Sequence, residues 1–251
     1  MRPRVFLGIT AAVLLRSSSE CQAHRSGSPD FRNGSPSSSG LTCTACHAPP
    51  GGTGTGSVQI LNAPAAYNFN RVYNINVQVA APAQAGAGFE LSVENAAGTH
   101  LGTLILSDAT NTRFADNNPE WVTHSSSGVT NSISNWSAQG NSATFNLRWR
   151  APATNVGAVT FYAAGNAINN SMNSAGDRVY TTNVSATPVT CAVGDMDQDG
   201  FKNGADIAGF VESLLAPSTA SDAQFCAADI NVDGNVDLND VQLFVGLLVA
   251  P

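Results

Sequence analysis

The C-terminal segment 191–251 contains an internal duplication, and this feature constrains the fold more than any other. When residues 195–215 are laid over residues 229–249, DMDQDGFKNGADIAGFVESLL aligns with DINVDGNVDLNDVQLFVGLLV. Acidic or amide residues recur at loop positions 1, 3, 5, 9 and 12 of both copies, and glycine stands at position 6, where such a loop turns sharply. Apolar residues at helical spacing follow each loop. The sequence therefore predicts two similar loop–helix units.

Hard oxygen ligands at this spacing favour Ca²⁺ over Mg²⁺, because the loops supply many carboxylates rather than leaving places for water. The predicted ligands of the first loop are Asp195, Asp197, Asp199, the backbone carbonyl of Phe201, Asn203 and Asp206. Those of the second loop are Asp229, Asn231, Asp233, the backbone carbonyl of Asn235, Asp237 and Asp240. A segment with so much negative charge and one narrow apolar stripe per helix should need the metal in order to fold. The same charge argues against nucleic acid as a partner.

The duplicated unit is not an EF-hand, which would carry glutamate at position 12 and a helix before each loop; here position 12 is aspartate and no helical pattern precedes either loop. It resembles a type I dockerin module over residues 191–251. The resemblance implies a small calcium-loaded helical domain that binds a cohesin domain through its helix faces. Dockerins usually repeat a polar pair at loop positions 10 and 11, whereas this chain has Gly204-Ala205 and Leu238-Asn239. A cohesin-like partner and another cell-surface attachment therefore both stay open.

Two cysteines occupy equivalent places in the duplication. Cys191 and Cys226 each stand shortly before a loop, so we expect them to form a disulfide. In the chain-entropy account such a bond would stabilise the module by roughly 3–4 kcal/mol.

The N-terminus indicates export to the extracellular space or the cell surface. Arg2 and Arg4 precede the apolar run VFLGITAAVLL, and a small residue follows at Ala23, which predicts a signal peptide over 1–23. Residues 24–40 are rich in Ser, Gly and Pro and are predicted to be a flexible linker. No later apolar run is long enough to span a membrane.

The pentapeptide CTACH follows this segment, and C-x-x-C-H is the attachment signature of haem c. Cys43 and Cys46 would form the thioethers and His47 would bind the iron. A Cys43–Cys46 disulfide is the alternative, since a CxxC pair in an exported chain oxidises readily. Zinc fits less well, because only three ligands lie here. His124, in EWVTHSSSG between predicted strands, is a candidate second iron ligand, with a plain surface histidine as the alternative.

Between residues 57 and 189, short runs of alternating or β-branched residues are separated by turn residues, a pattern that predicts an antiparallel β-sandwich. The runs are SVQIL, YNINVQVAA, GFELSVEN, LGTLILS, ATFNLRWRAP, AVTFYAAGN and RVYTTNVSA. In FNLRW, Phe145, Leu147 and Trp149 share one apolar face.

Several of these stretches, among them GFELSVENAAGTHLGTL, WVTHSSSG and FNLRWRAPATNVGAVTFYAAGNAINN, resemble a bacterial reeler-type (reelin N-terminal-like) β-sandwich over about residues 40–185. The likeness is to an exported family in which a CxxCH segment precedes the sandwich and a variable C-terminal anchoring or sorting device follows. His124 matches the family pattern. The resemblance implies a mainly β fold, with a reeler-like sandwich at 41–189 and the small helical module at 191–251, but it implies no reaction.

Catalysis has little support in the sequence, and we assign no catalytic residue. Glu90 and Glu94 share a strand face, but nothing around them marks a cleft, so we expect a solvated acidic face there. No G-x-S-x-G occurs. The sequence indicates a secreted, non-catalytic modular protein whose haem-carrying sandwich serves a redox partner. The alternative is a haem-free adhesion or carbohydrate-binding module, which could be associated with polysaccharide degradation because dockerins often accompany such enzymes.

Overall fold

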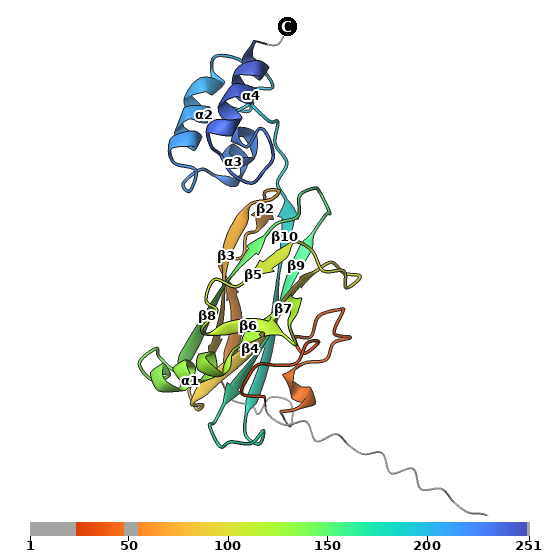
Figure 1. The fold of residues 1–251 in the computed structure, drawn as a ribbon, viewed down its shortest axis with the longest axis vertical. Coiled ribbons are helices and arrows are strands. Elements are labelled where there is room, and N and C mark those ends of the chain that lie inside the picture. Colours follow the sequence, from red (N-terminus) through yellow and green to blue (C-terminus); the bar gives the residue numbers. More distant parts are fainter. Residues whose placement is uncertain (1–23, 48–54, 250–251) are drawn as a thin grey trace, which may run out of the picture.

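The computed structural model describes residues 24–47 and 55–249, so the predicted signal peptide 1–23 lies outside the described residues. Within that part of the chain, ten strands form two sheets that pack face to face, and three helices form a separate unit beyond one end of them (Figure 1). Among the described residues, no helix is both long and apolar enough to cross a membrane.

The sheets are mainly antiparallel. The four-stranded sheet has the order β1 (Ser57–Leu61), β3 (Val72–Ala80), β8 (Ser142–Arg150), β5 (Thr103–Ile105). The six-stranded sheet has the order β2 (Ala66–Tyr67), β10 (Arg178–Pro188), β9 (Val159–Ile168), β4 (Gly86–Glu94), β7 (Asn118–His124), β6 (Thr112–Ala115). Every pairing is antiparallel except β2 with β10. The seven predicted runs are found as strands, which confirms the mainly β sandwich, whereas β2, β6 and β7 were not predicted.

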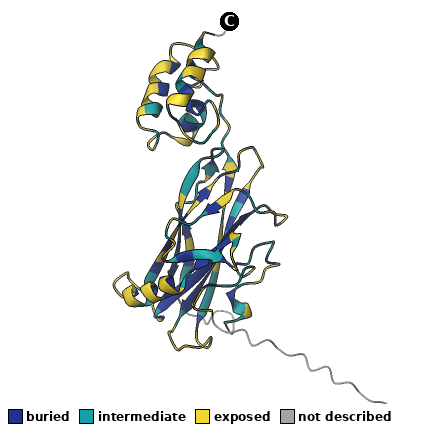
Figure 2. Cartoon of the chain, in the orientation of Figure 1, coloured by how far each residue is buried: buried dark blue, intermediate teal, exposed yellow. Residues whose placement is uncertain are grey.

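The core lies between the two sheets, where Figure 2 shows most of the buried residues. Along β8, Phe145, Leu147 and Trp149 are buried while the residues between them are exposed, as the alternation predicts. Phe145 stacks on Phe89 of β4 with ring centroids 4.6 Å apart, and Trp149 meets Phe161 of β9 edge-on at 5.0 Å. These aromatic pairs join the sheets and set their register against each other.

Strand β4 is buried on both faces, and this corrects an expectation from the sequence. Its outer face carries Glu90, Ser92 and Glu94, each of them completely or almost completely buried. The acidic face is therefore not solvated. A strand buried on both faces usually has a continuous apolar sequence. Strand β4 alternates instead, because the polar side chains on its outer face form hydrogen bonds with another segment of the chain rather than with water.

The cover is the segment 24–40, so the prediction of a flexible linker is wrong. The amide of Arg32 donates to Glu90 Oε1 at 2.7 Å, and the amide of Ser37 donates to Glu94 Oε2 at 3.0 Å. The small polar residues of segment 24–40, whose composition is typical of a linker, thus supply the hydrogen bonds that buried carboxylates require. Composition alone does not show this pairing.

Helix α1 (Ser126–Asn135) was also missed, because it is short and largely polar. Ser125 caps it by accepting a hydrogen bond from the amide of Gly128. Ser132 Oγ then accepts from the amide of Ala87 at 3.0 Å, which holds the helix against the start of β4.

The C-terminal unit consists of α2 (Asp206–Leu215), α3 (Asp222–Ala228) and α4 (Leu238–Leu248). Phe210 and Phe244, which occupy equivalent positions in the duplication, stack with ring centroids 4.0 Å apart in the centre of the unit. The predicted helices after both loops are therefore confirmed.

The predicted disulfide between Cys191 and Cys226 is also confirmed, with the two Cα atoms 6.0 Å apart. The expectation that no helix precedes either loop is wrong for the second, because α3 ends one residue before it. Its sequence signal is the capping box formed by Ser221 and Gln224.

Candidate functional site

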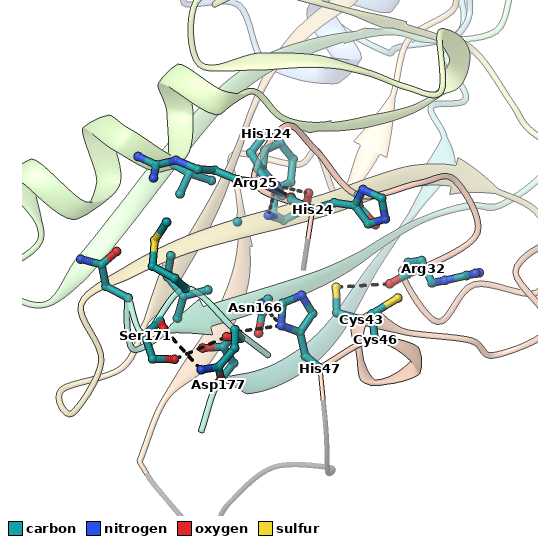
Figure 3. A pocket seen from close by; sticks show the side chains of 18 of the residues that line it. His24, Arg25, Arg32, Cys43, Cys46, His47, His124, Asn166, Ser171 and Asp177 are labelled. Atoms are coloured by element: carbon teal, nitrogen blue, oxygen red, sulfur yellow. Dashed lines mark hydrogen bonds and ion pairs between the residues drawn. The ribbon is translucent and has the colours of Figure 1, made fainter. Parts of the chain in front are cut away.

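A cavity of about 170 Å³ lies beside the ends of β4 and β9, under the N-terminal segment (Figure 3). Cys43, Cys46, His47 and His124 all line it, so the structure brings the four predicted cofactor-binding residues to one place. Much of the remaining wall is apolar. The apolar residues of the lining include Phe89, Val129, Ile133, Ile168 and Met172.

His47 is held by a buried carboxylate. Its Nδ1 lies 2.7 Å from Asp177 Oδ2, and the side-chain amide of Asn166 lies 3.0 Å from the same nitrogen. Because an ionised carboxylate can only accept, the contact with Asp177 favours a proton on Nδ1, and in the neutral ring the lone pair is then on Nε2. Asn166 Nδ2, itself a donor, cannot donate to Nδ1 in that tautomer. A carboxylate behind the far nitrogen is the usual arrangement for a histidine that binds a metal.

His124 is not a surface histidine, so that alternative is wrong: the residue is 8% exposed and ends strand β7. Its Nδ1 accepts a hydrogen bond from the amide of Phe89 at 3.0 Å, and its Nε2 lies 3.3 Å from the carbonyl oxygen of His24. The ring rests on Gly88, where a Cβ would come within 2.5 Å of it. Burial lowers the pKa of His124, so the ring is neutral.

The two cysteines of the motif are in different states. Cys43 begins the short 3₁₀ helix η1 (Cys43–Ala45), is buried, and directs its Sγ to the carbonyl of Arg32 at 3.6 Å. Burial, together with the negative charge of Glu90, raises the pKa of its thiol to about 12. Cys46 is disulfide-bonded while Cys43 is free, so the Cys43–Cys46 disulfide considered from the sequence is not formed.

Sequence reasoning missed Asp177, Asn166 and His24 as members of this site. Asp177 lies 130 positions from His47 along the chain, and no local motif links the two residues. Asp177 directly precedes β10 in a stretch whose sequence indicates only a turn. Its contact with His47 therefore depends on how the strands assemble in three dimensions.

The second candidate site is the pair of acidic loops, which repeat one hydrogen-bond pattern. At position 1, Asp195 accepts from the amide of Gly200 at 3.0 Å, and Asp229 accepts from the amide of Gly234 at 2.9 Å. Both glycines have positive φ, +90° and +88°, which explains why position 6 is glycine in each copy. The equivalence predicted from the sequence thus extends to single atoms.

Position 12 has the same role in both loops. Asp206 and Asp240 each accept from the amides of loop positions 2, 3 and 9, at distances between 2.6 and 3.3 Å. These carboxylates stand in the first turn of α2 and α4, and they tie each loop to its helix.

The donor set of the loops fits a divalent cation. In the first loop, oxygens of Asp195, Asp197 and Asp199 lie within 4.8 Å of one another. Asp195 Oδ1 is buried and has no hydrogen-bond partner among the described residues. In the second loop, burial, reinforced by the negative charge of Asp240, raises the pKa of Asp229 to about 6. A cation bound by several oxygens would give Asp195 Oδ1 a partner in the first loop and offset the repulsion between Asp229 and Asp240 in the second.

Comparisons with known proteins do not place the chain in a family. No protein-family model matches the sequence, and no curated protein matches it. The human F-spondin reeler domain is similar in structure, with 20% identity, a TM-score of 0.39, and coverage of 53% of this chain and 92% of that chain. The Reelin-N domain of F-spondin has 18% identity, a TM-score of 0.39, and coverage of 59% and 95%.

AggA, the major subunit of an Escherichia coli aggregative adherence fimbria, has 13% identity, a TM-score of 0.32, and coverage of 55% of this chain and 99% of that chain. The first two neighbours are domains of the class that the sequence resembles. With TM-scores below 0.5, none of the three carries an argument about function.

Proposed function

We propose that the protein is an exported, non-catalytic modular protein whose sandwich carries a covalently attached haem c for electron transfer or haem binding. In this proposal a dockerin-like C-terminal unit folds on two Ca²⁺ ions and attaches the sandwich to a cohesin-like or other cell-surface partner. The redox partner is a separate protein that reaches the cavity of the sandwich.

The observation that carries the haem proposal is the state of His47. Its Nδ1 lies 2.7 Å from Asp177 Oδ2, and in the neutral tautomer that donates to Asp177 its Nε2 has a lone pair beside a largely apolar cavity that Cys43 and Cys46 also line. Apolar walls with a few placed polar groups suit the flat apolar faces of a porphyrin, but a cavity of about 170 Å³ would have to widen to hold one. A carboxylate behind the proximal imidazole would also increase the basicity of the ligand.

The thiols must be reduced before haem can be attached. Cys43 and Cys46 would each add an S–H bond across a vinyl C=C bond, which forms a C–S and a C–H bond without net oxidation. The disulfide at Cys46 must therefore first take up two electrons and two protons from a dithiol reductant, which is itself oxidised to a disulfide. His124 could serve as the second ligand only after its Nε2 leaves the carbonyl of His24.

The haem-free alternative is favoured by one specific observation. Cys46 is in a disulfide, and burial keeps the thiol of Cys43 protonated. In that state Cys46 has no S–H bond to add to a vinyl group, so the pair of thioethers cannot form. The same cavity would then be the ligand site of an extracellular adhesion or carbohydrate-binding module.

Coexpression of the full chain with a cytochrome c maturation system separates the two candidates. We expect a red protein whose colour survives denaturation and whose mass increases by one haem. Changing Cys43 and Cys46 to serine should abolish the colour, whereas Asp177→Asn should keep the covalent haem but raise its reduction potential, because the carboxylate behind His47 favours the oxidised iron.

Changing Cys191 and Cys226 to serine is the matched control, because it removes two cysteines outside the cavity and should leave the colour unchanged. A colourless wild-type chain without added mass would reject the haem proposal in favour of the haem-free module.

A further inference from the structure

The helical unit contacts the sandwich at the turn between β2 and β3. Asn70 Nδ2 donates to the carbonyl of Val232, in the second acidic loop, at 2.8 Å. The guanidinium of Arg71 pairs with Asp222 at 3.1 Å and lies 3.9 Å over the ring of Phe225, both in α3. Figure 1 shows the helical unit standing beyond the β2 end of the sandwich. The contact therefore combines a side-chain-to-backbone hydrogen bond, an ion pair and a cation–π contact.

The two copies of the duplicated loop differ in this respect. A Cβ at Gly234 would lie 2.3 Å from the carbonyl carbon of Asn70, so the backbone of the second loop touches the sandwich where only glycine fits. At the equivalent Gly200, nothing lies within 4 Å of the same position. The backbone at both glycines has nearly the same φ, +88° and +90°. The difference in surroundings is thus not a difference in loop shape.

We infer that the second acidic loop is a docking element that fixes the helical unit on the sandwich, and that Ca²⁺ binding to this loop is coupled to that docking. The inference rests on the proposed calcium binding of the C-terminal unit and adds to it the identity of the surface that responds to the metal. The docking surface consists of Asn70 and Arg71 on the sandwich, and of Asp222, Phe225, Val232 and Gly234 on the helical unit.

The coupling follows from what the contacts need. Val232 has a φ of +58°, and its carbonyl accepts from Asn70. The same loop conformation closes around the buried carboxylates of Asp229 and Asp240, which accept hydrogen bonds from its amides. Without a cation their repulsion opposes the conformation that docks. Phe225 belongs to the core of the helical unit, so loss of that core would also remove the surface under Arg71.

Thermodynamic linkage makes the coupling reciprocal: if Ca²⁺ favours docking, docking must tighten Ca²⁺ at the second loop by the same factor. Breaking the contact should therefore weaken one of the two calcium sites and leave the other unchanged.

The test uses the full chain, with calcium titration by calorimetry and small-angle X-ray scattering at saturating Ca²⁺. Gly234→Ala and Gly200→Ala share the strain of alanine at a φ near +90°, but only the first meets the sandwich. We expect Gly234→Ala to broaden the distribution of distances between the two units, while Gly200→Ala keeps the wild-type distribution.

Arg71→Ala provides a second variant that leaves both loops intact. It should weaken one Ca²⁺ site by about fivefold or more and broaden the scattering distribution. Arg148→Ala, which removes an exposed arginine from β8, should change neither.

The inference is wrong if Arg71→Ala and Gly234→Ala both scatter like the wild type while two Ca²⁺ ions bind normally. A wild-type chain that binds no Ca²⁺ in the calorimeter would overturn the proposed calcium function and this inference with it. The two failures are therefore distinguishable.

Discussion

Removing Ca²⁺ is expected to unfold the C-terminal helical unit while the sandwich stays folded. The unit has a small core of its own, built around the stacked pair Phe210 and Phe244, and its loops hold most of its acidic residues. A site filled at a thousandfold excess over its Kd stabilises the folded state by about 4 kcal/mol. Two such sites would together contribute more stabilisation than the net folding free energy expected for a unit of this size, so the unit should unfold without them.

The double variant Asp199→Ala with Asp233→Ala removes the position 5 ligand from each loop, and it should stay unfolded even with excess Ca²⁺. Helical circular dichroism measured with and without a chelator reports this directly. Glu212→Ala removes an exposed carboxylate of α2 outside the loops and should keep the calcium response. Full helicity in the double variant would show that the disulfide and the small core suffice without metal.

The substitution Glu90→Gln is expected to stabilise the sandwich, and increasingly so as the pH rises. Burial raises the pKa of Glu90 from 4.5 to about 8, although the amide of Arg32 donates to it. The unfolded chain loses this proton above pH 4.5 while the folded chain keeps it, so the contribution of Glu90 to stability falls between about pH 4.5 and pH 8. At pH 7 the difference is worth about 3 kcal/mol.

Glutamine keeps the oxygen that accepts from the amide of Arg32. Its NH₂ group would take the place of Glu90 Oε2, which has no hydrogen-bond partner among the described residues, and burying it unpaired costs about 1 kcal/mol. The net gain should be about 2 kcal/mol at pH 7, should reach zero at about pH 5, and should become a net loss of up to about 1 kcal/mol below that pH. Chemical denaturation of both proteins across this pH range measures it.

Glu94→Gln is the control for this prediction, because Glu94 lies two residues away on the same buried face. Burial pushes its pKa up, but hydrogen bonds from surrounding serines, including the amide of Ser37 and the hydroxyl of Ser92, lower it overall. Its charged form therefore stabilises the fold, and that stability is lost as the pH falls through its folded pKa. Glu94→Gln should destabilise the sandwich at pH 7. Equal effects of the two substitutions would contradict the account of this face.

The parts of this protein that could be predicted from the sequence are those in which the signal is local. The acidic loops keep all their ligand positions within twelve residues, and the alternation in FNLRW places Phe145, Leu147 and Trp149 in the core. The disulfide between Cys191 and Cys226 followed from the duplication, which is also a local pattern seen twice.

The parts that could not be predicted depend on contacts between distant segments. The serine-rich segment 24–40 has the composition of a linker, and only the buried carboxylates of Glu90 and Glu94 give its amides a place to bind. The CTACH motif indicated three residues of the cavity, whereas Asp177 enters it from the far end of the sandwich sequence. Helix α1 was missed because its residues are largely polar. Strand β7 was missed because its last four residues, Trp121 to His124, are all buried and so show no alternation.

The most direct test of the central proposal, that the cavity around His47 holds a covalently bound haem, is to purify the chain from its native host and record its absorption spectrum and intact mass. We expect a Soret band that survives denaturation, with the mass of one haem on the peptide that contains Cys43 and Cys46. A colourless chain whose Cys46 is still in a disulfide would contradict the proposal.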